Sequence, residues 1–244
     1  MIKFGGKGIL LDIEGTTSSI RFVHDVMFPF VRQRLESFLS TQFHSPSVQS
    51  ACEQIARDAG HASLQAWRES EHHDDGRELI QSEVVRLMDI DAKATGLKAL
   101  QGIIWQAGFD SGELRAHVYP EVVPAIQRWR AAGKDVRMYS SGSVAAQKLF
   151  FGQVENWGNC LDLFSGHYDT TIGSKKHSPS YSAIAQDWRL EPAEILFISD
   201  VSAELTAAAE AGFQIAASIR PENDPIAGGF AECAITSFDQ IELL

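Results

Sequence analysis

The sequence is poor in the features of secreted and membrane-spanning proteins. Its 244 residues include only three cysteines, Cys52, Cys160 and Cys233, and no Cys-x-x-Cys pair. Cysteines so widely spaced predict neither a disulfide framework nor a zinc site, so we expect free thiols in a reducing compartment. No apolar run is long enough to span a membrane and no signal peptide is visible, so we expect a cytoplasmic protein with no membrane partner.

Basic residues are also scarce. The chain has 21 Lys and Arg against 32 Asp and Glu, which gives a formal net charge of −11. This balance argues against nucleic acid or an anionic membrane as the main partner, although a local cation can still bind an anionic small molecule. The length and the hydrophobic fraction of 44% fit a large single domain or a core with an insert.

The stretch from Gly8 to Thr17 organises the chain. Its apolar run, 9–13, predicts one buried strand, which is interrupted by Asp12 and followed by Glu14 and Gly15. Side chains alternate along a strand, so the two carboxylates would point to one side. Burying two carboxylates requires a cation or a proton, and oxygen ligands suit magnesium. On its own, the same pattern also fits a strand followed by an acidic turn.

Residues 22–118 show helical periodicity with almost no strand-like alternation. Pro29 predicts a kink or a new start in the first helix, and the polar stretch His72 to Asp75 indicates a solvated loop rather than a metal site. We therefore predict an all-helical insert. Its predicted helices cover about 22–39, 47–59, 61–70, 77–93 and 96–107.

From Tyr119 onward, helices alternate with apolar strands, and Pro221 and the stretch 228–229 predict loops. Apolar strands separated by helices indicate a parallel sheet covered on both faces, hence an α/β fold with a Rossmann-like core. The predicted helices cover 122–132, 145–152, 180–188 and 203–211, and the predicted strands 136–139, 163–164, 168–172, 195–198, 214–219 and 233–235.

Three of the predicted strands end in polar side chains. The first ends at Asp12 and Glu14, the strand 136–139 is followed by Ser140 and Ser141, and the strand 195–198 by Ser199 and Asp200. In open α/β sheets the ligand binds beyond the carboxyl ends of the strands, so these side chains should meet in one crevice.

Lys175 lies just before the predicted helix 180–188. Alone, it would be interpreted as a solvated surface lysine. Beside a cluster of carboxylates and a metal ion, a lysine can bind a phosphate oxygen and offset negative charge, and we favour this second interpretation.

These residues resemble the four motifs of the haloacid dehalogenase superfamily. The Asp12-Ile-Glu-Gly-Thr segment resembles motif I, and Met138-Tyr-Ser-Ser-Gly resembles motif II. Lys175 resembles motif III, and Ile198-Ser-Asp200 resembles motif IV. Their order and approximate spacing match across the whole chain. The resemblance implies a haloacid dehalogenase-type core formed by residues 1–20 and 119–244, with a helical cap inserted at residues 21–118.

Glu14, in place of the usual second Asp, makes motif I similar to that of the enolase-phosphatases of methionine salvage, also called acireductone synthases. The resemblance runs from residue 9 to about residue 221. It departs at His177, where family members carry an acidic residue, and we expect this to alter only a local contact at a helix start. Further similar segments are Leu100-Gln-Gly, Trp105, His117-Val-Tyr-Pro120, residues 139–143, residues 146–149, and Asp200-Val with Glu204.

The resemblance implies a role for each motif residue. Asp12 would be the nucleophile that forms an aspartyl-phosphate, and the Glu14 side chain the general acid-base. One Mg²⁺ per chain would be bound by the carboxylates of Asp12 and Asp200 and by the backbone carbonyl of Glu14. The phosphate would be held by Ser140, Ser141 and Lys175.

The family carries out two steps on one small phosphorylated diketone. It enolises 2,3-diketo-5-methylthiopentyl-1-phosphate and then removes the phosphate, giving the acireductone 1,2-dihydroxy-3-keto-5-methylthiopentene. The sequence does not assign the base for enolisation, and the resemblance suggests a monomer. Aromatic side chains of the insert, which also fit a purely structural role, offer a pocket for the methylthio tail: Phe22, Phe28, Trp67, Trp105 and Phe109.

Three other functions fit part of the pattern. An Mg-dependent phosphatase of another small phosphomonoester would keep every motif but lack enolase activity. A dehalogenase would use Asp12 without magnesium, and Glu14 and Asp200 as a metal pair argue against it. A non-catalytic binding protein on the same fold is expected to have lost Asp12, Lys175 or Asp200, and all three are present.

Overall fold

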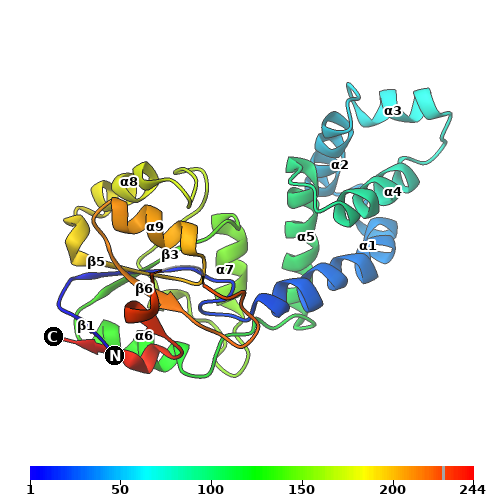
Figure 1. The fold of residues 1–244 in the computed structure, drawn as a ribbon. Coiled ribbons are helices and arrows are strands. Elements are labelled where there is room, and N and C mark those ends of the chain that lie inside the picture. Colours follow the sequence, from blue (N-terminus) through cyan, green and yellow to red (C-terminus); the bar gives the residue numbers. More distant parts are fainter. Residues whose placement is uncertain (227–228) are drawn as a thin grey trace. The chain divides into compact units, whose positions relative to one another are not determined.

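The computed structural model describes residues 1–226 and 229–244, and it divides into two compact units (Figure 1). The first unit contains Met1–Val23 and Arg115–Leu244, and the second contains His24–Leu114. Pro221 lies in a turn, in agreement with the predicted loop, whereas Gly228 lies outside the described residues.

The first unit is built on a parallel sheet whose six described strands have the order β4-β3-β2-β5-β6-β7. β2 and β5 form its centre, with Leu11 beside Ile198, and the strand order runs outward from this pair in both directions. Such a reversal is where ligand sites form in open α/β sheets. The strands are β2 (Gly8–Leu11), β3 (Asp135–Tyr139), β4 (Gly166–Tyr168), β5 (Ile195–Ser199), β6 (Gln214–Ser218) and β7 (Ala234–Ile235).

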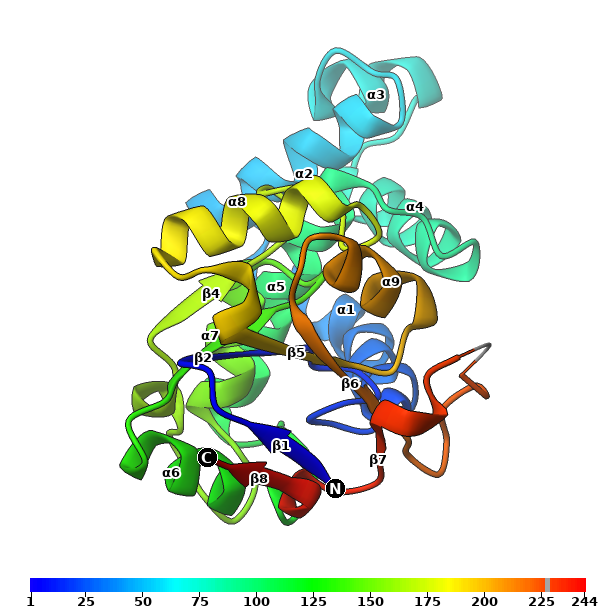
Figure 2. The same ribbon diagram turned by 60° about the vertical axis from the view of Figure 1, so that its left-hand side comes forward.

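Helices cover both faces of this sheet. α8 and α9 lie on one face and α6 on the other (Figures 1 and 2). Leu10, Phe197, Tyr181 and Leu205 are fully buried between the sheet and its α8–α9 layer, in agreement with the apolar run that β5 carries up to its final Ser199. These features confirm the predicted α/β class. The helices are α6 (Val122–Ala131), α7 (Val144–Gly152), α8 (Ser178–Trp188) and α9 (Ser202–Glu210).

Two strands were not predicted. β1 (Ile2–Phe4) pairs in parallel with β8 (Ile241–Leu243), so that the two chain ends lie side by side (Figure 2). Each has three residues, which is too short for a periodic pattern to be recognised. Short 3₁₀ helices complete the unit at Leu161–Leu163, Pro192–Glu194, Ala231–Cys233 and Phe238–Gln240.

The predicted strands at 163–164 and 168–172 are wrong. The strand in this region is β4, Gly166–Tyr168, and it follows a 3₁₀ helix that ends at Leu163. β4 stops because Asp169 forms a local turn, in which its carboxylate accepts hydrogen bonds from both the backbone N–H and the hydroxyl of Thr171.

The second unit is helical throughout its length. Pro29 lies in the first turn of α1, directly after a π-helix at Phe22–Met27, which confirms the predicted new start; proline fits there because the first turn needs no N–H. His72 ends α3 in the left-handed conformation and begins the predicted exposed loop. The helices are α1 (Phe28–Gln42), α2 (Pro46–Asp58), α3 (Leu64–Glu71), α4 (Gly76–Asp89) and α5 (Thr95–Ser111).

The sequence analysis predicted free thiols and no membrane-spanning segment. All three cysteines are free: Cys52 and Cys160 are buried, and Cys233 is half-buried. In the part of the chain that the structure describes, no helix has both the length and the apolar character needed to cross a membrane.

Candidate functional site

The turn that follows β2 carries the first two acidic residues of the site. Asp12 extends the ladder between β2 and β5 by donating its backbone N–H to the carbonyl of Ile198 at 3.0 Å. The chain then turns back on itself, because the backbone N–H groups of residues 16, 17 and 18 all donate to the carbonyl of Ile13. Glu14 lies within this compact turn, two residues from Asp12.

Gly15 allows the turn to approach the end of β5 closely. Its φ of +69° is in the left-handed region, which favours glycine. A Cβ at this position would lie 2.1 Å from Oδ2 of Asp200, a contact that no side chain can make. The glycine of motif I is therefore required both by the backbone conformation and by the neighbouring carboxylate.

A cavity of about 100 Å³ is bounded by residues that follow β2, β3 and β5. The structure places every residue predicted for the site in its lining: Asp12, Glu14, Ser140, Ser141, Lys175 and Asp200. Three lining residues were not in the predicted set, namely Ile20, Val201 and Glu204.

A larger cavity, about 760 Å³, lies in the second unit among residues 43–74. Its lining mixes His, Arg and Glu side chains, and several of these are already paired: Glu53 accepts the N–H of Leu64, and Gln65 donates to Glu69. Because convergent chemistry rather than volume identifies a reactive site, the smaller cavity is the candidate active site.

Lys175 is buried between two carboxylates, so the interpretation as a surface lysine is wrong. Its Nζ lies 2.5 Å from Oδ1 of Asp12 and 2.7 Å from Oε2 of Glu204, and the residue is only 6% exposed. The hydroxyl of Tyr181 donates to the Lys175 backbone carbonyl at 2.7 Å, which fixes the lysine from the side of α8.

Glu204 is the site residue that the sequence prediction missed. It lies in the first turn of α9, is 7% exposed, and accepts a hydrogen bond of 2.9 Å from the hydroxyl of Ser199. The sequence does contain a signal for Glu204. It follows Asp200 by four residues, and a helix that begins between the two directs the Glu204 side chain back toward Asp200.

Burial and charge shift the titration of this cluster. Burial raises the pKa of Asp12 to about 8; Lys175 opposes that shift, while Glu204 and Asp200 add to it. Burial likewise raises the pKa of Asp200 to about 6. Burial lowers the pKa of Lys175, but the carboxylates of Asp12 and Glu204 more than reverse this, so its pKa is raised and the lysine is a cation.

These shifts predict how the stability of the metal-free protein depends on pH. Both aspartates bind a proton more tightly in the folded chain than in the unfolded one, where the pKa is 3.8. Their stabilising contribution is therefore complete below about pH 4 and is lost as the pH rises to about 8. In EDTA, we expect the melting temperature to fall by several degrees between pH 5 and pH 8.

The matched variant Asp200→Asn tests the origin of that slope. It removes one titrating carboxyl, so its melting temperature should fall less steeply than that of the wild type over the same pH range. Parallel slopes for the two proteins would show that Asp200 does not titrate in this range.

The same cluster fits a divalent cation. Oδ1 of Asp200 is buried and has no hydrogen-bond partner, and a bound cation would satisfy it. Among residues 1–226 and 229–244, no three His, Cys, Asp or Glu side chains are grouped as metal ligands, so a cation between Asp12 and Asp200 needs a backbone oxygen as well. The Glu14 carbonyl, a ligand that the sequence resemblance implies, would supply such an oxygen, and an all-oxygen set suits magnesium.

The loop after β3 offers the donors predicted for phosphate. Ser140 is 6% exposed, and its hydroxyl accepts the backbone N–H of Gly142 at 3.2 Å, which leaves its own proton to donate. The side-chain amide of Gln147, on α7, donates to the carbonyls of Gly142 and Tyr168, which ties the loop after β3 to the end of β4.

The structure also shows the surroundings of His177 and Phe22, two residues that the sequence analysis singled out. His177 precedes α8 and forms no side-chain bond with the helix start, so the position at which the chain departs from the family lacks a capping contact. Phe22, predicted in the helical insert, belongs to the first unit instead, where it packs edge-on against Phe150 at 5.7 Å.

The other aromatic side chains predicted to surround the methylthio tail lie in the second unit. Trp67 and Phe109 are buried there, and the indole N–H of Trp105 donates to the carbonyl of Met27 at 2.9 Å. Phe28 packs against Trp105 with ring centres 6.1 Å apart. All four thus have packing roles within that unit.

Comparison with known proteins identifies the family. The model of the haloacid dehalogenase-like hydrolases matches residues 7–212. The chain is 42% identical to Enolase-phosphatase E1 of Enterobacter sp. (strain 638), with 96% of each chain covered, and 42% identical to Enolase-phosphatase E1 of Aquifex aeolicus, with 97% of this chain and 99% of the relative covered.

A solved structure is similar to this chain over nearly its full length. The crystal structure of UTR4 protein from Saccharomyces cerevisiae superposes with a TM-score of 0.78 at 30% sequence identity, over 97% of this chain and 100% of that chain. Similarity of this extent covers the sheet, the helical unit and the cavity together. The chain therefore belongs to the haloacid dehalogenase-like hydrolases and, among them, to the family of the Enolase-phosphatase E1 proteins.

Proposed function

We propose that this protein is an acireductone synthase of methionine salvage. It enolises 2,3-diketo-5-methylthiopentyl-1-phosphate and then hydrolyses the phosphate ester, which gives 1,2-dihydroxy-3-keto-5-methylthiopentene. The observation that carries this proposal is the cavity in which Asp12, Glu14, Lys175 and Asp200 meet, in a chain 42% identical to enolase-phosphatases over nearly its full length.

The residues of this cavity account for phosphoryl transfer. A carboxylate oxygen of Asp12 attacks phosphorus; the bond between phosphorus and the C1 oxygen of the substrate breaks, and the carboxyl of Glu14 protonates that oxygen. Glu14 then takes a proton from water, and the water oxygen attacks phosphorus and releases Asp12 with inorganic phosphate. Lys175, Ser140 and Ser141 hold the phosphate oxygens while negative charge shifts.

One Mg²⁺ per chain would be held by the carboxylates of Asp12 and Asp200 and by the Glu14 carbonyl. When bound, it neutralises the acidic cluster and supplies positive charge to the phosphate and to the enolate oxygen. Lys175 alone cannot do this, because it already faces two carboxylates.

We also propose that the two units divide the work. The first unit is the catalytic core, predicted at residues 1–20 and 119–244, and the second is the cap, predicted at 21–118. In the structure, the chain passes from one compact unit to the other between residues 23 and 24 and between residues 114 and 115. The monomeric state and the cytoplasmic location stay predictions from the sequence.

The function is tested with the diketo phosphate and the purified protein, by following ultraviolet absorbance and released phosphate together. With Mg²⁺, an enol chromophore should form and equimolar phosphate should follow; in EDTA neither should appear. Phosphate release from generic phosphomonoesters, with no chromophore from the diketone, would indicate instead a phosphatase of another small phosphomonoester.

Replacing Glu14 by Gln should lower turnover far more than it weakens magnesium binding. The variant keeps the backbone carbonyl of residue 14, which is proposed to bind the cation. Its side-chain amide cannot transfer the proton, so kcat should fall by about 10²–10⁴-fold. Titration of Mg²⁺ by calorimetry, alongside the phosphate assay, separates the two effects. Weak magnesium binding with normal kcat at saturating magnesium would contradict these roles.

A further inference from the structure

The turn that carries Glu14 is held by a segment more than 200 residues away in the sequence. We call residues 218–223 the tether segment. The hydroxyl of Ser218 and the side-chain amide of Asn223 both donate to the carbonyl of Gly15, at 3.2 and 2.8 Å. The guanidinium of Arg220 donates twice to the carbonyl of Thr16, from Nε at 3.2 Å and from Nη2 at 2.9 Å.

These bonds satisfy backbone carbonyls of a buried turn. Thr16, Thr17 and Ser18 are fully buried, and their N–H groups are all used by the carbonyl of Ile13. The carbonyls of Gly15 and Thr16 also need donors, because a buried carbonyl without a partner is costly. The tether segment supplies four such donors, of which Arg220 provides two.

Arg220 is itself held on every side. It is 6% exposed, and its Nη1 donates to the carbonyl of Thr236 at 2.9 Å and forms an ion pair with Glu121 at 2.7 Å. Its guanidinium stacks over the ring of Tyr119 at 4.1 Å and faces Phe238 at 5.4 Å. A planar cation fixed in this way presents a rigid fork to its acceptor.

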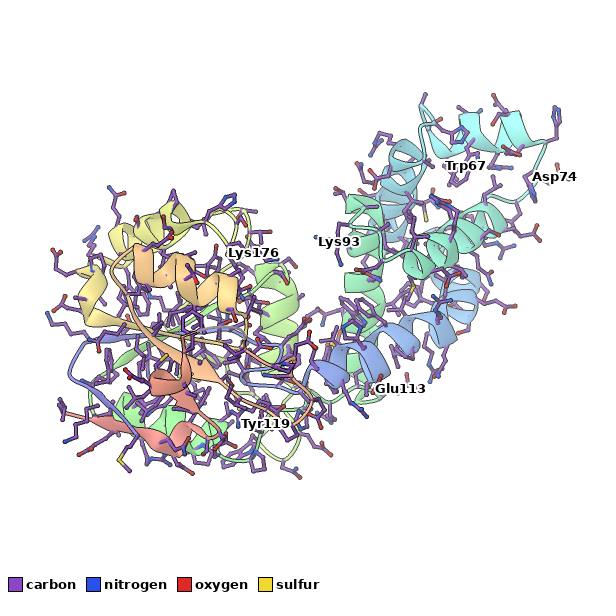
Figure 3. All side chains as sticks on the ribbon, viewed as in Figure 1. Trp67, Asp74, Lys93, Glu113, Tyr119 and Lys176 are labelled. Atoms are coloured by element: carbon purple, nitrogen blue, oxygen red, sulfur yellow. The ribbon has the colours of Figure 1, made fainter. Side chains whose placement is uncertain are left out.

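Tyr119 links this arrangement back to the same turn. It lies on the segment that leads into α6 (Figure 3), and its backbone N–H donates to the carbonyl of Thr17 at 3.0 Å. The carbonyls of Gly15, Thr16 and Thr17 are therefore each held by segments other than β2, the strand that Asp12 follows.

We propose that Arg220 is a positioning residue of the reaction, which holds the turn 13–18 so that the Glu14 carboxyl stays at working distance from Asp12. The proposal rests on the proposed function, because it takes Glu14 as the acid-base group. Ser140 and Lys175, which are proposed to hold the phosphate, follow β3 and precede α8, outside the turn that Arg220 holds. Loss of Arg220 should therefore lower kcat and leave KM largely unchanged.

The experiment compares Arg220→Lys and Arg220→Met with the matched pair Arg128→Lys and Arg128→Met. Arg128 is in the same unit and is paired with the exposed Asp239 at 2.6 Å, so its loss should change nothing. Each protein is assayed for kcat and KM with p-nitrophenyl phosphate and with the diketo phosphate. Amide hydrogen exchange of the peptide spanning residues 13–18 is measured in parallel.

The expected result is graded. Arg220→Met should lower kcat by about 10²-fold, as a misplacement of about 1 Å does, with KM within about threefold of the wild type. Arg220→Lys keeps the charge opposite Glu121 and one donor, so it should recover part of the loss. Exchange should accelerate in residues 13–18 and not in α8 or α9. If Arg220→Met does not fold, Asn223→Ala should show the same pattern at smaller size, because it removes the side-chain bonds to the carbonyls of Gly15 and Ser218 and leaves Arg220 in place.

Two results would overturn the proposal: folded Arg220 variants with wild-type kcat, or faster exchange spread over the whole first unit with kcat unchanged per folded molecule. If the proposed function is wrong, the assay of the wild-type protein gives a different result. The wild type would then release phosphate from p-nitrophenyl phosphate without converting the diketone, and the Arg220 comparison would still be decided with the first substrate.

Discussion

Replacing Asp12 by Asn is expected to lower the rate of phosphate release on the order of 10⁴-fold or more, because the amide is nearly isosteric but a poor nucleophile. The fold should persist. Asp12 shares a single buried cation with Glu204, so the neutral amide removes a negative charge from a cluster that has an excess of it. Circular dichroism and melting in EDTA measure the fold, and a single-turnover phosphate assay measures the chemistry.

The control for this variant is Asp162→Asn, a change of the same size on a 3₁₀ helix outside the cavity, which should retain full activity. Asp12→Asn with activity comparable to this control would remove Asp12 from the nucleophile role and leave the other carboxylates of the cavity as candidates.

Replacing Lys175 by Met should affect both activity and stability. It leaves Asp12 and Glu204 buried without their cation, and breaking one side of a buried ion pair costs about 3–5 kcal/mol. The free energy of unfolding in EDTA should fall by this amount at pH 8 and by less at pH 5, where the carboxylates can take up protons. Phosphate release should fall on the order of 10³-fold, since a positioned cation of the phosphate site is lost.

The neighbouring lysine provides the control. Lys176 is exposed and is labelled in Figure 3, so Lys176→Met should leave both measurements close to the wild type. Denaturant unfolding of the two variants, with and without Mg²⁺, gives the comparison. Equal stability of both variants in EDTA at pH 8 would contradict the buried ion-pair network.

Most of the fold followed from two local signals. Apolar runs bounded by turns located β2, β3, β5 and β6, and the periodic apolar positions located α2, α4, α5, α6 and α9 to within a few residues. The edge of the sheet was harder, because β4 has three residues and is ended by the turn at Asp169. The pairing of β1 with β8 joins the two ends of the chain, and short-range patterns carry no information about such contacts.

Six of the nine residues that line the cavity were predictable, because each of the six lies next to an apolar strand or belongs to a recognisable motif. Glu204 is contributed by a helix, and the tether segment is set by contacts at long range. Arg220 looks like an ordinary loop arginine in the sequence. Only the structure shows it buried between Tyr119 and Phe238, with two bonds to Thr16. Residues that position a catalytic turn lack a local sequence signature, because their partners are remote.

Rapid quenching of the reaction shows whether Asp12 becomes phosphorylated during turnover. The wild-type protein is mixed with the diketo phosphate and Mg²⁺ for less than one turnover, quenched in acid and treated with borohydride, which reduces an aspartyl-phosphate to homoserine. Mass spectrometry of the peptides then locates the modified residue. We expect homoserine at position 12 in the wild type and none at that position in Asp12→Asn. Phosphate release with no homoserine, or with homoserine at another position, would contradict it.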